Sequence, residues 1–404
     1  MLIYNIGMLA GILPEGVGRL RGADIGRLES LTDAWLLVRD GRIADFGTMD
    51  TCPSREGADD IDARRGIVLP AFCDCHTHLV YAGSREGEFR DKIAGMSYAE
   101  IAARGGGILN SARRLAEATE DDLYEESLRR LRQICASGTG VVEIKTGYGL
   151  TLDSELKMLR VIARLREAVP QMAIRATFLG AHAVGPDYTG RQEAYVDHVI
   201  DDMLPAVAAQ GVADYVDVFC ERGFFTAGQT SRILQAGRSH GLLPRLHADQ
   251  LLRSGGTATG IAAGALSVDH LEAAGPDEIA LLAASDTIGV GLPGASFFLS
   301  DPYAPLNDII AAGGTVALAS DYNPGTSPSG SMLFVWALGC IKMRLTPEAA
   351  LNAATINGAT ALGLQADYGS VTRGKRASLN IFDAPSLAFI PYAYTTPTLV
   401  ATVR

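Results

Sequence analysis

Positive charge is scarce in this 404-residue chain, and its scarcity excludes one class of function. Lysine and arginine together number 35 against 46 acidic residues, which gives a formal net charge of −11 at pH 7. Nucleic-acid binding requires clustered basic side chains that neutralise phosphates. The arginine pairs at 113–114 and 129–130 stand among acidic residues on helical patterns, where we expect solvated helix faces. We therefore expect no nucleic-acid partner.

Long apolar runs and paired cysteines are also lacking. No stretch is long and uncharged enough to span a bilayer, and the opening residues, MLIYNIGMLAGILPEG, lack the basic segment of a secretion signal. The six cysteines are spread along the chain without the spacing of a disulfide scaffold, and Cys73 and Cys75 are expected to be small buried hydrophobic residues. These absences predict a reduced, cytoplasmic protein that does not enter a membrane.

The middle of the chain alternates between short apolar runs and amphipathic helical stretches. The apolar runs are residues 66–78, 139–149, 173–182, 213–223, 242–250, 266–272, 287–295 and 314–325. Helical patterns such as 121–138 and 154–169 separate them. Strands that alternate with helices in this number predict a parallel sheet closed into a (β/α)8 TIM barrel, with a doubly wound open sheet as the alternative.

Both ends of the chain have a sequence pattern typical of β-strands and tight turns, unlike the middle. Residues 35–47, WLLVRDGRIADFG, predict a hairpin around an Asp-Gly pair, and residues 369–383 have turn glycines followed by a strand-like run. Because the two ends share this pattern, we expect them to pair into one small β-sandwich domain. The predicted domains are residues 1–65 and 361–404 for the small β domain and residues 66–360 for the barrel.

The chain has only seven histidines, and five of them fall where predicted strands end. His76 and His78 stand two positions apart, which places both on the same face of a strand. Functional residues of TIM barrels lie at the carboxyl ends of the strands. Six of the eight runs end in such a candidate: His76 with His78, His182, Glu221, His247, His270 and Asp321. Any one of these histidines alone is more simply a hydrogen-bonded core residue, but their joint placement predicts a metal centre.

The ligand set His76, His78, His247 and Asp321 would supply three nitrogens and one oxygen, a combination that suits zinc or Fe(II). Such an ion lowers the pKa of bound water towards ~7 and makes hydroxide available at neutral pH. The main alternative of another class is a barrel that has lost its metal, although all four positions hold competent ligands. A Rossmann-type oxidoreductase is disfavoured because no GxGxxG follows the first strand.

The segments LPAFCDCHTHLVYAG, RLHADQ, SVDHLE and ALASDYNPGTSPS resemble the amidohydrolase superfamily, and the resemblance extends over nearly the whole chain. Residues 83–108, EIKTGYGL and DYNPGTSP carry a narrower resemblance, to the members that convert 4-imidazolone-5-propanoate into N-formimino-L-glutamate in histidine degradation. The resemblance implies hydrolysis of a ring amide C–N bond in a small-molecule substrate. It also implies one divalent or trivalent metal ion per chain, zinc or iron, and a homodimer.

The resemblance further implies roles for individual residues. The metal ligands would be His76, His78, His247 and Asp321. The substrate contacts would be Arg85, Tyr148, His182, Gln250, Asn323, Gly325 and Thr326. Arg85 offers a planar fork that matches the substrate's propionate. His270 and Asp321 would be the catalytic groups, with His270 stabilising the oxyanion and one of the two protonating the leaving nitrogen.

Two departures from the superfamily pattern shape these expectations. Gln250 stands where some members have glutamate, and an amide cannot move protons, so acid–base work is expected of His270 and Asp321. Binuclear relatives use a carboxylated lysine on the fourth strand, whereas Lys145 lies on the second and the fourth ends in Glu221, which predicts a single metal. Another amidohydrolase activity on a cyclic amide or amidine, that of a ring deaminase or hydantoinase, is the alternative. The missing carboxylate counts against a deaminase.

Overall fold

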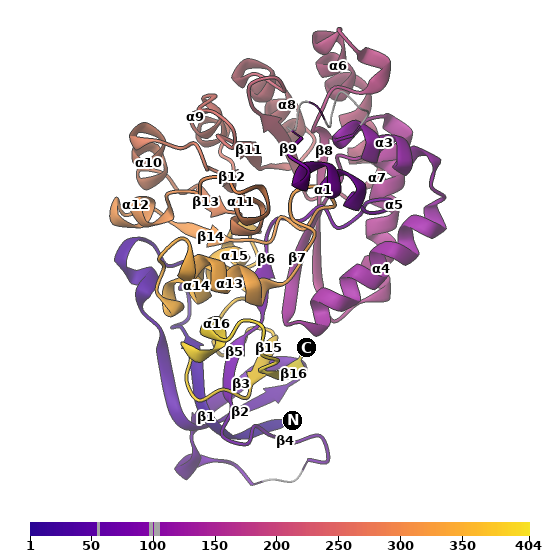
Figure 1. Cartoon of the computed structure of the whole chain (residues 1–404). Coiled ribbons are helices and arrows are strands. Elements are labelled where there is room, and N and C mark those ends of the chain that lie inside the picture. The colour runs from indigo at the N-terminus through magenta and orange to yellow at the C-terminus, as the bar shows by residue number, and fades with distance from the viewer. Residues whose placement is uncertain (55–56, 97–99, 101–105) are drawn as a thin grey trace.

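The computed structural model describes residues 1–54, 57–96, 100 and 106–404. It contains a parallel sheet surrounded by helices and a smaller sheet beside which both chain ends lie (Figure 1). Part of the 83–108 segment that carried the narrower resemblance, residues 97–99 and 101–105, lies outside the described residues.

Eight parallel strands, ordered as in the sequence, form the barrel. They are β6 (Phe72–Asp74), β7 (Thr139–Lys145), β8 (Ala173–Ala181), β9 (Tyr215–Cys220), β11 (Leu246–Ala248), β12 (Ser267–His270), β13 (Ile288–Gly291) and β14 (Val316–Leu318), with the short β10 (Leu243–Pro244) beside β9. The segments after β6 and β14 close the ring, where the Asp321 N–H donates to the His76 carbonyl at 3.0 Å. The predicted TIM barrel is confirmed, and the open doubly wound sheet is wrong.

Helices cover the outside of the barrel (Figure 1). The two predicted by pattern are α4 (Glu120–Ala136) and α5 (Leu152–Ala168), which begin where Thr119 and Thr151 accept backbone N–H groups of the first turn. The others are α1 (Glu86–Ile93), α3 (Ile108–Glu117), α6 (Gln192–His198), α7 (Leu204–Gln210), α8 (Ala227–Ser239), α9 (Gly256–Ala262), α10 (Pro276–Ala283), α11 (Pro293–Leu299), α12 (Leu306–Ala311), α13 (Met332–Ile341), α14 (Pro347–Ala354), α15 (Ile356–Ala361) and α16 (Phe389–Tyr392). Among the described residues, no helix combines the length and apolarity needed to cross a membrane.

The smaller sheet takes strands from both ends of the chain. Its order is β16 (Leu399–Val403), β15 (Leu379–Phe382), β5 (Ile67–Pro70), β1 (Leu2–Ile12), β2 (Glu29–Arg39) and β3 (Arg42–Thr48), with β4 (Ile61–Asp62) paired to β1. Buried side chains from these strands, including Ile6, Leu36 and Leu379, form one apolar cluster. The small terminal β domain and its β2–β3 hairpin are confirmed, and the boundaries at residues 65 and 360 stay predictions.

The first predicted barrel strand, residues 66–78, is divided between the two sheets. β5 pairs with β15 in the terminal sheet, whereas β6 pairs with β7 in the barrel. His76 and His78 follow the end of β6, where the backbone N–H of Lys145 donates to the Thr77 carbonyl at 2.9 Å. The apolar run is continuous because both sheets bury it, so its composition does not mark the change of sheet.

Candidate active site

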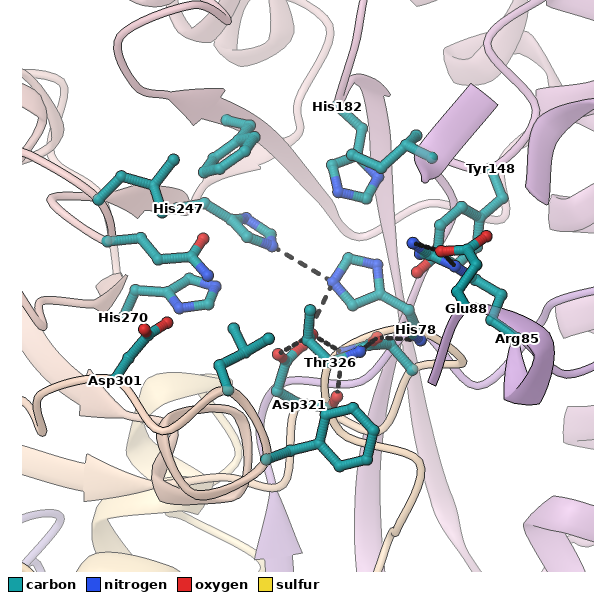
Figure 2. Close-up of a pocket in the computed structure, with 18 of the residues that line it drawn as sticks. His78, Arg85, Glu88, Tyr148, His182, His247, His270, Asp301, Asp321 and Thr326 are labelled. Atoms are coloured by element: carbon teal, nitrogen blue, oxygen red, sulfur yellow. Dashed lines mark hydrogen bonds and ion pairs between the residues drawn. The ribbon is translucent and has the colours of Figure 1, made fainter. Parts of the chain in front are cut away.

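A cavity of about 610 Å3 opens at the carboxyl ends of the barrel strands (Figure 2). It is lined by Arg85, Tyr148, His78, His182, His247, Gln250, His270, Asp321, Asn323, Gly325 and Thr326. His76, the remaining predicted site residue, is fully buried beside the cavity, with its ring centroid 4.5 Å from that of His247. The structure therefore brings together side chains from residue 76 to residue 326 at the carboxyl ends of the barrel strands, as the strand-end pattern predicts.

Three imidazoles form a compact cluster at the cavity floor. One ring nitrogen from each of His76, His78 and His247 lies within 4.8 Å of the others. The Nε2 atoms of His78 and His247 are 3.3 Å apart, and Asp321 Oδ1 is 3.6 Å from Nε2 of His76 and from Nε2 of His78. Two nitrogens bound to one zinc ion at about 2.0–2.1 Å in tetrahedral geometry stand roughly 3.3–3.4 Å apart. The spacing and donor set therefore fit a single metal ion.

Two buried carboxylates fix the orientation of the imidazoles. Nδ1 of His76 donates to Asp269 at 2.7 Å, and Nδ1 of His247 donates to Asp217 at 3.0 Å. Because each carboxylate accepts the Nδ1 proton, each ring presents its Nε2 lone pair to the cluster. In the part of the chain that the structure describes, His76 Nε2 is buried and has no hydrogen-bond partner, as expected of an atom that awaits a cation.

Burial favours the neutral form of two of the clustered imidazoles. It lowers the pKa of His76 and of His78 well below the usual value, and the neighbouring imidazoles act in the same direction. The neutral form is the one that binds a metal ion. Burial raises the pKa of Asp321, whose carboxylate lies among these rings.

His270 differs from the cluster because a carboxylate faces it. Burial opposes its charged form, but the carboxylates around it, first Glu272 with Oε1 3.4 Å from His270 Nδ1 and then Asp321 and Asp269, together raise the pKa. His270 has a φ of +87°, a conformation that non-glycine residues rarely adopt and that is often found at functional sites. This imidazole is thus the one in the cavity best prepared to carry a proton.

His182 is held as a neutral hydrogen-bond acceptor. Burial lowers its pKa to about 3, and its Nδ1 donates to the Gly147 carbonyl at 3.0 Å. Its ring stacks on that of His78 with centroids 5.1 Å apart, and Tyr148 lies 5.5 Å from it on the same wall. Since Nδ1 carries the proton, Nε2 can accept a hydrogen bond from an N–H in the cavity.

Arg85 lines the cavity beside Tyr148, and Glu88 holds its guanidinium in place (Figure 2). The Glu88 carboxylate accepts from Arg85 Nε and Nη2 at 2.8 and 2.5 Å, and also from the backbone N–H of Gly107. Arg85 Nη1 lies 2.2 Å from the position that a Cβ at residue 325 would occupy. Glycine at position 325 therefore lets the guanidinium approach the loop that lines the cavity.

The loop after β14 is organised by Asn323. Its side chain donates to the Asp321 carbonyl and to Thr326 Oγ1, and accepts from the backbone N–H groups of Gly325 and Thr326, at 2.7 to 2.8 Å. Thr326 Oγ1 in turn lies 3.5 Å from Asp321 Oδ2. Asn323 thus shapes the loop, while Thr326 links it to the candidate metal ligand.

Gln250 and Glu221, both near strand ends, differ in whether they face the cavity. Gln250 lines the cavity, as expected of a residue that binds substrate. Glu221 instead accepts the backbone N–H groups of Arg222, Leu251 and Leu252 and so fixes the loop after β11. The strand-end pattern that singled out Glu221 does not distinguish a ligand from a loop anchor.

Four carboxylates that support the site were not predicted from the sequence: Glu88, Asp217, Asp269 and Glu272. Asp217 and Asp269 alternate with apolar residues inside buried strands, and such charges on the inner face of a strand are a usable signal because isolated buried charges are rarely tolerated. Glu88 and Glu272 follow Arg85 and His270 by a few residues and carry no distinguishing pattern.

The chain is similar in sequence to proteins of known function. The amidohydrolase family profile matches residues 232–402. The chain is 50% identical to imidazolonepropionase of Flavobacterium johnsoniae over 97% of this chain and 96% of that protein. It is 43% identical to imidazolonepropionase of Geobacillus kaustophilus over 96% and 91% of the two chains.

Solved structures share the fold at low sequence identity. Klebsiella pneumoniae 5-methylcytosine deaminase superposes with a TM-score of 0.72 at 17% identity, over 98% of this chain and 95% of that one. A zinc-bound adenosine deaminase from Xanthomonas campestris gives a TM-score of 0.67 at 17% identity, over 96% and 85%. With the fold, the clustered ligands and full-length relatives in agreement, the chain belongs to the imidazolonepropionase family of amidohydrolases.

Proposed function

We propose that this protein hydrolyses the ring amide C–N bond of 4-imidazolone-5-propanoate to give N-formimino-L-glutamate, a step of histidine degradation. The observation that carries the proposal is the joint presence, in one cavity, of a histidine cluster fit for a metal ion and of an arginine fit for a carboxylate. Both features occur in a chain with full-length imidazolonepropionase relatives.

The residues proposed to hold the metal are His76, His78 and His247 through Nε2 and Asp321 through a carboxylate oxygen. This donor set suits one zinc or iron ion per chain. When bound, the ion supplies Lewis acidity and makes hydroxide available at neutral pH. The spacing of the nitrogens and the unpartnered His76 Nε2 support this assignment.

Substrate orientation is proposed to rest on groups around the cavity wall. Arg85 pairs with the propionate through the part of its fork that Glu88 leaves available, and His182 Nε2 accepts a ring N–H. Tyr148, Gln250 and Thr326 line the same space and complete the polar contacts. Apolar side chains such as Phe219 give the planar ring a surface to lie against.

Proton movements are proposed to involve Asp321 and His270. Water adds to the ring carbonyl carbon, and its proton passes to the Asp321 carboxylate. His270, whose pKa the Glu272 carboxylate raises, stabilises the negative oxygen that develops, and His270 or Asp321 then protonates the ring nitrogen as the C–N bond breaks. The products of this cleavage are the new carboxylate and the formimino group on one open chain.

Ring deamination fits less well. That chemistry needs a carboxylate proton shuttle after the histidine of β11, and Gln250 stands there with no proton to transfer. The resemblance of the fold to deaminases extends to the architecture alone.

We further propose a homodimer located in the cytoplasm. The family resemblance suggests the dimer, and the six free thiols are consistent with a reducing compartment. Light scattering at micromolar concentration tests the dimer, and a mass near that of one chain would reject it.

Product analysis tests the proposed reaction. Mass spectrometry of 4-imidazolone-5-propanoate incubated with the protein should show the addition of one water and an open-chain product. Release of ammonia with the ring intact would instead indicate a deaminase. An unchanged substrate would direct the search to other cyclic amides and amidines.

A further inference from the structure

Five charged side chains are buried inside the barrel, directly beneath the histidine cluster. They are Glu143, Lys145, Asp217, Arg245 and Asp269, and none is more than 1% exposed. Three carboxylates and two cations in such a space are costly to bury, and apolar residues of similar volume would often stabilise a protein at least as well. The arrangement therefore calls for an explanation beyond stability.

Lys145 is the bridge between the two carboxylates that orient the imidazoles. Its Nζ lies 3.0 Å from Asp217 Oδ2 and 3.9 Å from Asp269 Oδ2. Asp217 accepts from His247, and Asp269 accepts from His76. A continuous path of polar contacts thus runs from one candidate metal ligand to another through a single ammonium group.

The strand that carries Lys145 also fixes the segment between the paired histidines. The Lys145 N–H donates to the Thr77 carbonyl at 2.9 Å, and Thr77 Oγ1 donates to the Glu143 carbonyl at 2.7 Å. Glu143 accepts from Lys145 Nζ at 2.8 Å and from the Thr77 N–H at 3.2 Å. The backbone and side chains of β7 therefore hold His76 and His78 from below.

We propose that Lys145 is a positioning residue for the metal centre: its ammonium group holds Asp217 and Asp269 at the separation that keeps the imidazoles of His247 and His76 directed at one ion. This inference rests on the proposed metal-dependent function. Without the ammonium group, the two aspartates and Glu143 face one another with only Arg245 to balance them. Their repulsion then turns the aspartates away from the rings.

Arg245 does not duplicate this role. Its guanidinium bonds to Asp269 at 2.9 Å, but its other contacts go to the carbonyls of Cys75 and Ala361. Lys145 is therefore the cation that contacts both Asp217 and Glu143 and reaches towards Asp269. Loss of this one side chain should disturb two ligands at once.

The test measures how fast the metal-loaded protein releases its ion. Parent and Lys145→Met proteins are mixed with excess chelator, and metal release is followed with a metal-sensitive dye. Changes in the groups that orient metal ligands typically cost about 10–100-fold in metal affinity. We expect metal release from Lys145→Met to be faster by a factor in that range. Release within threefold of the parent rate, from a folded variant, overturns the proposal.

Two further variants separate positioning from stability. The pair Lys145→Met with Glu143→Gln removes one charge of each sign, and should fold while still releasing metal quickly. Lys375→Met removes a buried lysine of the segment before β15, whose ammonium group donates to Ser370 Oγ and to the Tyr368 carbonyl, and should leave the release rate unchanged even if it lowers stability. If Lys145→Met is unfolded both alone and in the pair, Lys145 is required for folding and the proposal fails.

The metal content of the parent protein separates a failure of this proposal from a failure of the proposed metal-dependent function. A parent that binds no metal at all contradicts the metal-dependent function. A parent that holds one ion, together with variants that release it at the parent rate, contradicts the role of Lys145 alone.

Discussion

At the scale of single residues, the proposed metal ligands and the proposed carboxylate-binding arginine can be tested separately. His247 belongs to the ligand cluster, and His247→Ala removes one of the proposed nitrogen ligands. We expect metal content and activity to fall together, with activity reduced by at least about 10²-fold. Elemental analysis beside an activity assay checks this, and a variant that keeps its metal and its rate contradicts the ligand assignment.

Substitution of Arg85 tests the proposed binding of the substrate's carboxylate. Arg85→Ala should keep the metal, because Arg85 is not one of the proposed ligands and its guanidinium pairs with Glu88, but should bind the propionate poorly. Loss of a buried charge-assisted bidentate contact is expected to raise KM about 10²-fold or more. A variant with an unchanged KM shows that the carboxylate binds elsewhere.

Gly325 offers an independent test of the Arg85 position. A methyl group at residue 325 would meet Arg85 Nη1 at 2.2 Å, so Gly325→Ala must displace the guanidinium. We expect a raised KM and full metal content, as for Arg85→Ala. Gly228→Ala is the matched control, because a Cβ there meets nothing within 4 Å. Equal kinetics for Gly325→Ala and its control would argue against this contact.

The pH dependence of the reaction tests His270 as the proton carrier. Glu272 is the main carboxylate that raises the pKa of His270, so the protonated form persists to higher pH than in an ordinary histidine, and the rate falls as pH rises through that pKa. Glu272→Gln removes the carboxylate and should move the alkaline limb of the kcat/KM profile to lower pH. An alkaline limb that stays in place assigns it to another group.

At the scale of elements, the alternation of apolar runs was enough to predict all eight barrel strands, because each strand is buried on both faces and each is followed by a helix. The division of residues 66–78 between β5 and β6 was not predictable from composition, since burial continues across both sheets. Asp217 and Asp269 were not recognised because their role depends on which side chains face each other across the barrel, which a single sequence does not state.

The loop after β14 gives a prediction at this scale. Asn323 makes four hydrogen bonds within the loop, so Asn323→Ala leaves the half-buried backbone N–H groups of Gly325 and Thr326 without their acceptor. We expect a loss of about 1–3 kcal/mol in the free energy of unfolding, measured with urea, along with weaker activity. Unchanged stability would mean that other contacts hold the loop.

At the scale of the whole molecule, His76 and His78 follow β6, His247 lies in β11 and Asp321 follows β14, so the proposed ligands lie on both sides of the seam where the barrel closes. An ion held by all of them would join strands that are otherwise linked there by few backbone hydrogen bonds. The histidine positions and the strand order were both accessible from the sequence. The buried charges beneath the histidines and the pairing of Glu88 with Arg85 could be identified only from the structure, because the barrel brings distant strands together.

The central claim is that one ion per chain enables the hydrolysis. The most direct measurement loads metal-free protein stepwise with zinc or ferrous iron and follows the loss of imidazolone ultraviolet absorbance at each step. We expect a rate that rises in proportion to bound metal and levels off at one ion per chain. Full activity in metal-free protein, or a rate that continues to rise to two ions per chain, would contradict this claim.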